Sequence, residues 1–398
     1  MAQSAGNTIE LNPTQPDVKR SFQNSIQGDK GIWTIVLLLS LISLAVVYSS
    51  SSSLAYREST TAFFFLLKQS GFVLIGFAVL YVCHRIPLGW YRKLAVIGLI
   101  ASIFLLIITP FIGVTLNNGT RWLKVLGFSF QPAEVAKIAL MLYIAKVVES
   151  SELKTFKEFA IYLLLPISAV CLLILWGSVS AGIMLGGIAF IVLVVAGVSG
   201  PYLVKTVGII AVVAVLVFAI AKWTHLFPRI ETAVSRFTTY VHDDKGDHFQ
   251  ATQAKIAIAS GGFFGKGPGN STQRYILPHP YSDFIYATIV EEYGVVGGAT
   301  VMLLFIWLFY RTYRIAKQCT RVFSSLLAVG LGVLIVLQAI LHMCVNVGLL
   351  PVTGQTLPLV SLGGTSFVIM SAAFGMILAV SRTVDKKQTE ETTEVVTS

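Results

Sequence analysis

Runs of apolar residues recur along this chain and limit its fold more than any other feature. A run of about 20 apolar residues is long enough to cross a bilayer as a helix. Charged residues make up 12% of the 398 residues, against about 25% in soluble domains. We therefore predict an all-α polytopic membrane protein with about ten transmembrane helices. The predicted spans are 32–50, 62–83, 94–112, 132–148, 159–176, 178–198, 203–221, 284–310, 323–349 and 359–381.

The basic residues predict how these spans are oriented. If the N-terminus is cytoplasmic, 17 of the 29 Lys and Arg residues fall in cytoplasmic segments, and only Arg57, Arg121 and Lys124 fall in short outer loops. This is the bias described by the positive-inside rule. We therefore expect both termini in the cytoplasm. The formal charge of +10 is then explained by contact with a membrane surface, and we predict no nucleic-acid binding.

The spans divide the chain into three parts. Residues 1–31 form a cytoplasmic N-terminal tail, residues 32–382 the ten-helix membrane domain, and residues 383–398 a polar cytoplasmic tail that we expect to be disordered. A long outer loop, residues 222–282, separates spans 7 and 8, and its scattered apolar residues predict that it is folded. Within this loop, the His and Asp cluster at 242–248 is expected to be solvated rather than metal-binding, and the glycine-rich stretch 265–271 to form an irregular turn.

Four ionisable residues within or at the edge of predicted spans stand out: Lys68, Glu134, Lys137 and Asp283. A charge at such a position costs about 2.5–3.5 kcal/mol on insertion scales, so it needs a reason. Glu134 and Lys137 lie three residues apart, on one face of a helix that Pro132 is expected to open, and they can pair there. Two interpretations of Glu134 and Lys137 remain open: a structural ion pair, or part of a functional site. With Arg121 nearby, the common depth of these groups suggests a shared polar cavity in the outer half of the membrane.

Asp283 stands at the start of the eighth predicted span. It follows Ser282, which we predict to be the N-cap, and a carboxylate in the first helical turn is favoured in its charged form. Asp283 is therefore either a capping carboxylate or part of a site. Glu291, eight residues further on, is expected to be structural rather than a member of that site.

Four stretches of the sequence resemble the SEDS family (shape, elongation, division and sporulation), which includes FtsW, RodA and the sporulation homologue of FtsW. The match covers nearly the whole chain apart from its tails, and the Gly-Asn-Ser-x-Gln form at 269–273 is closer to the division branch than to the elongation branch. The stretches are Asn118-Gly-Thr-Arg-Trp122 with Phe130-Gln-Pro-Ala-Glu134 and Lys137; Gln250-Ala-Thr-Gln253 with Gly261-Gly262; Gly265 to Gln273 with Ser282-Asp-Phe-Ile-Tyr286 and Glu291-Glu292; and Asn346-Val-Gly-Leu-Leu-Pro351 with Ser361 and Gly363-Gly-Thr-Ser366.

The resemblance implies a peptidoglycan glycosyltransferase that polymerises lipid II on the outer face of the cytoplasmic membrane, at the division septum. Asp283 matches the family's essential aspartate and would act as general base, directly or with a divalent cation, Mg²⁺ or Mn²⁺, and no organic cofactor is expected. The expected partners are a class B penicillin-binding protein and other division proteins. The positions that match substrate-binding residues are Lys68, Arg121, Gln131, Glu134, Lys137, Ser361, Gly363 and Gly364.

The sequence also departs from the family pattern. The aspartate usual between the fifth and sixth spans is missing from the stretch Gly177 to Ala181, Tyr281 stands where histidine is common, and Lys68 replaces the usual arginine. Two other functions remain open: transport of lipid II across the membrane, and a non-catalytic role as a scaffold for division proteins. A role in elongation, as for RodA, is a third alternative to the division role.

Overall fold

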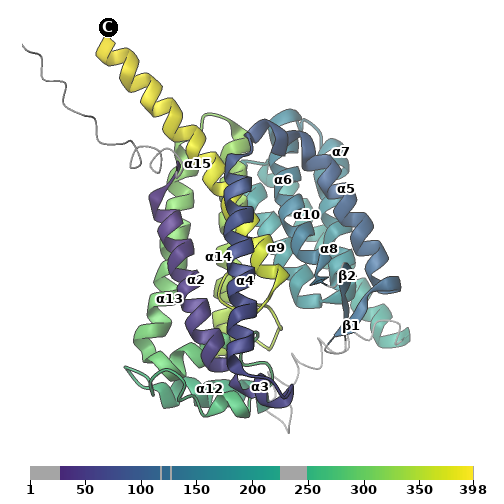
Figure 1. The fold of residues 1–398 in the computed structure, drawn as a ribbon. Coiled ribbons are helices and arrows are strands. Elements are labelled where there is room, and N and C mark those ends of the chain that lie inside the picture. The colour runs from purple at the N-terminus through teal and green to yellow at the C-terminus, as the bar shows by residue number, and fades with distance from the viewer. Residues whose placement is uncertain (1–26, 117–118, 126–127, 225–248, 398) are drawn as a thin grey trace, which may run out of the picture.

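Each of the ten predicted spans corresponds to a helix in the computed structural model, which describes residues 27–116, 119–125, 128–224 and 249–397 (Figure 1). Seven of the helices in these ranges are long and apolar enough to cross a membrane. Val179–Val195 and the Gly200–Val212 part of a further helix are shorter apolar segments. The prediction of an all-α polytopic membrane protein is thereby confirmed. The helices are α2 (Lys30–Ser50), α4 (Ala62–Arg85), α5 (Leu88–Ile112), α6 (Pro132–Ser150), α7 (Phe156–Phe159) continued by a π-helical turn (Ala160–Leu164) into α8 (Leu165–Gly177), α9 (Val179–Val195), α10 (Gly200–Thr224), α13 (Ile285–Gln318), α14 (Val322–Asn346) and α15 (Thr365–Thr397).

Apart from α7, the short elements gather at the end of the bundle that lies opposite the C-terminus (Figure 1). We call this end the loop end. These elements are α3 (Ser52–Arg57), β1 (Val114–Leu116), β2 (Gly119–Val125), β3 (Phe128–Phe130), α12 (Phe249–Gly261) and a 3-10 turn (Gln273–Tyr275). The strands form an antiparallel sheet in the order β1-β2-β3. Hydropathy does not predict this sheet, because strands of three to seven residues carry too little apolar pattern.

Helix α13 is interrupted at Gly294, whose φ of 69° lies in the left-handed region. Residues 262–267 dock at this break: the Lys266 and Gly267 N–H groups donate to the Glu291 and Glu292 carbonyls at 3.0 and 2.9 Å, and the Val295 N–H donates to the Gly262 carbonyl at 3.0 Å. An inserted segment that takes over helical hydrogen bonds is a recognised cause of a kink. The first nine residues of α13 therefore form a separate short helix at the loop end.

The two glutamates before this break bond to different elements, Glu291 to the loop that docks there and Glu292 to α2. The Glu291 carboxylate accepts hydrogen bonds from Lys266 Nζ at 2.7 Å and from the Thr272 backbone at 3.0 Å, and the Glu292 carboxylate accepts one from Ser49. Both side chains are buried. The structural role expected for Glu291 is confirmed. The turn predicted at 265–271 is also present, with positive φ at its three glycines.

One terminal prediction is wrong. The residues after 382 do not form a disordered tail, because α15 continues through Thr397. Extending an existing helix needs no new nucleation, and the Lys, Gln and Glu residues of this stretch are good helix formers. The predicted loop cluster at 242–248 lies outside the described residues, as does most of the N-terminal tail.

We predict that Gly294→Ala destabilises the protein. The added Cβ would lie 2.2 Å from the Phe263 carbonyl oxygen at a backbone angle that favours glycine, and strain of this kind costs about 1–3 kcal/mol. Thermal unfolding in detergent should show a Tm several degrees below that of the wild type, by the usual relation of free energy to Tm. Gly208→Ala is the control, because nothing lies within 4 Å of the position of its Cβ. Equal Tm values for Gly294→Ala and wild type would contradict the prediction.

Candidate active site

Asp283 lies at the loop end, in a turn that precedes α13. The helix begins at Ile285 and its N-cap residue is Phe284, whose side chain makes no capping hydrogen bond. The prediction that Ser282 caps this helix is therefore wrong. Ser282 Oγ instead donates to Asp283 Oδ1 at 2.9 Å, and the Asp283 N–H donates to the His279 carbonyl at 3.1 Å. The turn is not part of the helix, and its polar groups bond to one another and to the His279 carbonyl.

A second segment, residues 347–364 between α14 and α15, fixes the backbone of this turn. The Leu362 N–H donates to the Tyr281 carbonyl at 2.9 Å, and Ser361 Oγ donates to the Ser282 carbonyl at 2.8 Å. The same Ser361 oxygen accepts the Leu357 N–H at 2.8 Å. Ser361 is buried, so the structure places this predicted substrate-binding residue beneath the Asp283 turn. Its contact with substrate stays a prediction.

The Asp283 carboxylate is half-buried and lies beside Gly354 of this segment. A Cβ at Gly354 would come within 3.5 Å of Asp283 Oδ2, and the φ of Gly354 is +65°. The neighbouring Thr353 carbonyl accepts a hydrogen bond from Ser180 Oγ at 3.3 Å, which brings the start of α9 to the same place. Residues far apart in the sequence therefore converge around one carboxylate.

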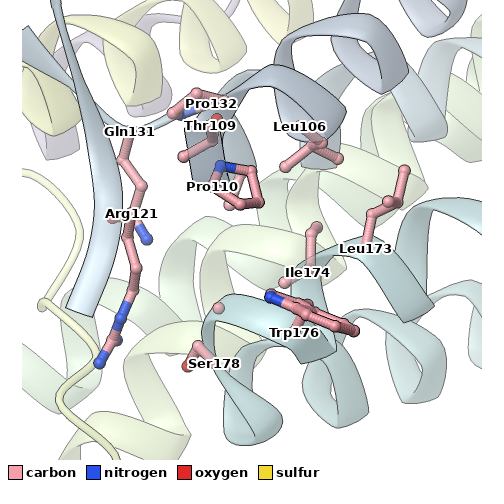
Figure 2. Close-up of a pocket in the computed structure, with 12 residues that line it drawn as sticks. Leu106, Thr109, Pro110, Arg121, Gln131, Pro132, Leu173, Ile174, Trp176 and Ser178 are labelled. Carbon is pink, nitrogen blue, oxygen red and sulfur yellow. The ribbon is translucent and has the colours of Figure 1, made fainter. Parts of the chain in front are cut away.

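Arg121 and Gln131 lie on one wall of a groove at the loop end, and Leu173, Ile174 and Trp176 lie on the opposite wall (Figure 2). The groove encloses about 400 Å³ of space, part of it open to solvent. Arg121 comes from β2 and its side chain passes over Gly177, whose Cβ would lie 3.5 Å from Arg121 Cγ. One cationic side chain beside an apolar wall suits an amphiphile with an anionic group. The remaining lining residues are Leu106, Thr109, Pro110, Pro132, Ala133 and Ser178.

Glu134 and Lys137 form the predicted ion pair, with 2.7 Å between Lys137 Nζ and Glu134 Oε1. Pro132 opens their helix α6, as the sequence predicts. Lys137 Nζ also donates to Gln338 Oε1 at 2.8 Å, and the Lys137 side chain is only 2% exposed. The structure therefore places this pair in the core behind the groove. Contact of either residue with substrate stays a prediction.

The other predicted site residues lie on α4 and on the segment before α15. Lys68 is exposed on α4 and makes no hydrogen bond or ion pair within the described ranges. One turn further along α4, Phe72 covers Gly364, where an added Cβ would meet the ring at 3.2 Å. Gly363 and Gly364 lead into Thr365, whose hydroxyl donates to the Ser129 carbonyl of β3 at 2.8 Å. The two glycines thus lie where the segment 347–364 meets the sheet.

Three buried polar residues of α14 belong to this site but are not predicted as site residues by the sequence: Gln338, His342 and Asn346. They follow one another at intervals of four, so they share one face of a helix. The spacing can be read from the sequence, but hydropathy averaged over the helix does not detect three polar residues in an apolar run. We call them the α14 stripe.

Asp283 is the one carboxylate that a metal ion could use in the described part of this site. The described residues contain no group of three or more His, Cys, Asp or Glu side chains that could hold a metal. An all-protein metal cage is therefore not present in these ranges. The arrangement does fit Mg²⁺, which is commonly bound through one or two carboxylates together with substrate phosphates.

Comparison with known proteins gives one consistent result. Residues 29–386 match a family model for the FtsW, RodA and SpoVE proteins, described as cell cycle protein. The chain is 35% identical over 363 residues to a protein of Thioalkalivibrio sulfidiphilus named "Probable peptidoglycan glycosyltransferase FtsW", covering 89% of each. It is 32% identical over 357 residues to stage V sporulation protein E of Bacillus subtilis, covering 87% of this chain and 95% of that one.

The fold is similar to that of a chain in a solved peptidoglycan synthase complex, described as coordinating polymerization and crosslinking. The TM-score is 0.73 at 23% sequence identity, and the similarity covers 90% of this chain and 98% of the other. At this identity the similarity supports the arrangement of the helices alone.

We predict that the Glu134–Lys137 pair responds to substitution as a unit. Lys137→Met leaves a buried carboxylate without its cation, and such a loss costs about 3–5 kcal/mol. The double variant Glu134→Gln/Lys137→Met should be more stable than Lys137→Met, because neither charge remains. Thermal unfolding of both single variants and the double variant measures the coupling.

The exposed pair Lys154–Glu152, whose side chains are 76% and 79% exposed, provides the control. Lys154→Met should leave the Tm nearly unchanged, because exposed pairs contribute little. A double variant less stable than either single would contradict the assignment of Glu134 and Lys137 as a buried pair.

Proposed function

Because the chain belongs to the FtsW, RodA and SpoVE family of cell cycle proteins, we propose that it is a peptidoglycan glycosyltransferase of the FtsW type, acting in cell division on lipid II. The observation that carries the proposal is the position of Asp283. Its carboxylate is half-buried, its turn is fixed by Ser361 and Leu362, and it lies at the same end of the bundle as the groove that Arg121 lines.

In the proposed reaction the 4-hydroxyl of the acceptor sugar attacks the anomeric carbon of the donor. The new glycosidic C–O bond forms, the bond from that carbon to the pyrophosphate breaks, and the pyrophosphate leaves with the electron pair. Asp283 accepts the hydroxyl proton as general base. A half-buried carboxylate can approach a sugar hydroxyl, and its fixed backbone limits the motion that would misalign the transfer.

The cationic residues would hold the pyrophosphate groups. Arg121 offers a planar fork that binds phosphate oxygens with two hydrogen bonds, and Lys68 offers a point charge. Gln131 lies beside Arg121 in the groove, whose apolar wall suits the isoprenoid part of a lipid substrate. We assign Glu134 and Lys137 a supporting role, because Lys137 already donates to Glu134 and Gln338. Ser361, Gly363 and Gly364 would shape the same cavity.

A divalent cation, Mg²⁺ or Mn²⁺, forms part of the proposal. Asp283 would supply its protein carboxylate, and the pyrophosphate of the substrate would supply further oxygen ligands. The ion would neutralise charge that develops on the leaving pyrophosphate. This arrangement needs no second protein carboxylate, in keeping with the single acidic residue in the Asp283 turn.

The proposal also includes a partner, an orientation and a location. The partner is a class B penicillin-binding protein, a transpeptidase that would crosslink the strands made here, together with other division proteins. The protein is a multi-pass membrane protein. We propose that both termini are cytoplasmic and that the loop end faces outward at the division septum of the cytoplasmic membrane, in keeping with the distribution of basic residues.

We predict that Asp283→Asn abolishes polymerisation of lipid II by the purified protein with its partner. Loss of a general base lowers kcat by about 10²–10⁴-fold, while the Tm should not change. Glu58→Gln, which removes an exposed carboxylate at the loop end, is the control and should keep wild-type activity. EDTA should lower the wild-type rate and added Mg²⁺ or Mn²⁺ should restore it. Wild-type protein that moves labelled lipid II across vesicles without polymerising it would support a transporter instead.

We predict that Arg121→Lys lowers the catalytic efficiency of the protein with lipid II. The ammonium keeps the charge but loses one of two hydrogen bonds to a charged group, so kcat/KM for lipid II should fall about tenfold. Arg314→Lys, a change at the opposite end of α13 from Asp283, is the control. An Arg121→Lys protein with wild-type kcat/KM would remove Arg121 from the proposed binding residues.

A further inference from the structure

The α14 stripe joins the two segments that surround Asp283. Gln338, His342 and Asn346 are at most 1% exposed, and all three side chains bond to groups outside their own helix. A buried polar side chain in a membrane helix is less favourable than an apolar one unless its hydrogen bonds are needed. Leu at these positions would serve for packing alone. The role of the α14 stripe therefore lies in the groups to which its side chains bond.

Asn346 supplies the helix cap that Phe284 lacks. Its Oδ1 accepts the Ala287 N–H at 3.0 Å, which is one of the N–H groups that the first turn of α13 leaves without a helical partner. Its Nδ2 donates to the Asp283 carbonyl at 3.1 Å and to the His342 carbonyl at 2.8 Å. One amide thus bridges both sides of the turn that carries the carboxylate. Its orientation is set because the partner of Oδ1 is a donor and both partners of Nδ2 are carbonyl acceptors.

His342 and Gln338 hold the facing segment. His342 Nδ1 lies 2.7 Å from the Gln355 carbonyl oxygen, and Gln338 Nε2 donates to the Thr356 carbonyl at 3.1 Å. A carbonyl oxygen only accepts, so His342 Nδ1 must carry the proton. These two bonds fix the backbone directly after Gly354, which borders the Asp283 carboxylate. Gln338 also accepts from Lys137, so the stripe is anchored to α6.

We propose that the α14 stripe is the positioning element of the active site: Asn346 sets the Asp283 turn, His342 and Gln338 set the segment that faces it, and their common helix fixes the distance between the two. The inference rests on the glycosyl transfer proposed for Asp283. A shift of about 1 Å in a reacting group can cost on the order of 100-fold in rate. Loss of a stripe hydrogen bond should therefore lower kcat with little effect on KM.

The test compares conservative and disruptive variants at two stripe positions, in the full-length protein with its partner and lipid II. Asn346→Leu removes the bridge, and Asn346→Asp keeps an acceptor for the Ala287 N–H but loses the donor to the Asp283 carbonyl. His342→Leu removes the donor to Gln355, whereas His342→Asn places an amide N–H where Nδ1 stands. Cys344→Ala, on the same helix but outside the stripe, is the control.

We expect kcat to fall at least tenfold in Asn346→Leu, Asn346→Asp and His342→Leu, with KM within about twofold, because a hydrogen bond to a positioned group is worth about one decade or more. His342→Asn should recover most of the wild-type kcat. Cys344→Ala should behave as wild type. A purely structural role would lower the yield or Tm of all variants without separating kcat from KM. Wild-type kcat in a folded Asn346→Asp protein would overturn the inference.

A second measurement does not depend on activity. Hydrogen–deuterium exchange should rise at residues 279–288 in the Asn346 variants and at 353–357 in His342→Leu, while the exchange of α4 and α5 stays unchanged. Unchanged exchange at both segments would overturn the positioning role, whether or not the protein polymerises lipid II. A wild-type protein that is inactive on lipid II but shows the expected exchange pattern would instead overturn the proposed function and leave the positioning role supported.

Discussion

Backbone groups inside a membrane protein must find their hydrogen-bond partners within the protein, and this constraint determines how the loop end is built. Helix α13 starts late, at Ile285, and breaks at Gly294. Each irregularity exposes N–H and C=O groups that a continuous helix would satisfy. Residues 262–267 bond to the carbonyls at the break, and Asn346 bonds to the groups at the start. Asp283 lies at the second of these places, directly before the start of α13.

The same constraint explains why polar residues cluster at this end. Glu291 holds the segment that docks at the break, and Glu292 accepts a hydrogen bond from Ser49 of α2. Ser361 and the α14 stripe hold the Asp283 turn and the segment beside it. Each of these side chains is buried and bonded to backbone or to a neighbouring side chain. Buried hydrogen bonds that join separate segments restrict how those segments can be arranged. The carboxylate of Asp283 is held in place by bonds that are mostly made to its neighbours' backbone.

The parts of this structure that depend on neighbours in the sequence could be predicted, and the parts that depend on distant segments could not. The spans follow from apolar length, and the Glu134–Lys137 pair follows from a spacing of three. Ser282 is a good N-cap by local criteria, but Asn346, 63 residues beyond Asp283, holds the start of α13 instead. The sheet that carries Arg121 is set by pairings such as Leu123 with Phe130, in strands too short to leave a pattern. The four-residue spacing of the α14 stripe can be read from the sequence, but only the structure shows which groups these side chains bind.

The groove and the carboxylate are two parts of one rigid frame. Gln131 borders the groove immediately before α6, and Lys137 lies within α6 less than two turns further on. Lys137 donates to Gln338 of α14 at 2.8 Å, and α14 carries Asn346, which holds the Asp283 turn. A buried charge that is bonded to two partners resists displacement, because moving it would leave an unpaired ion in the core. The ion pair thus has a use even if it never contacts substrate. Through α6 and α14, it connects the groove, which would bind the pyrophosphate, to the turn whose carboxylate would accept the proton.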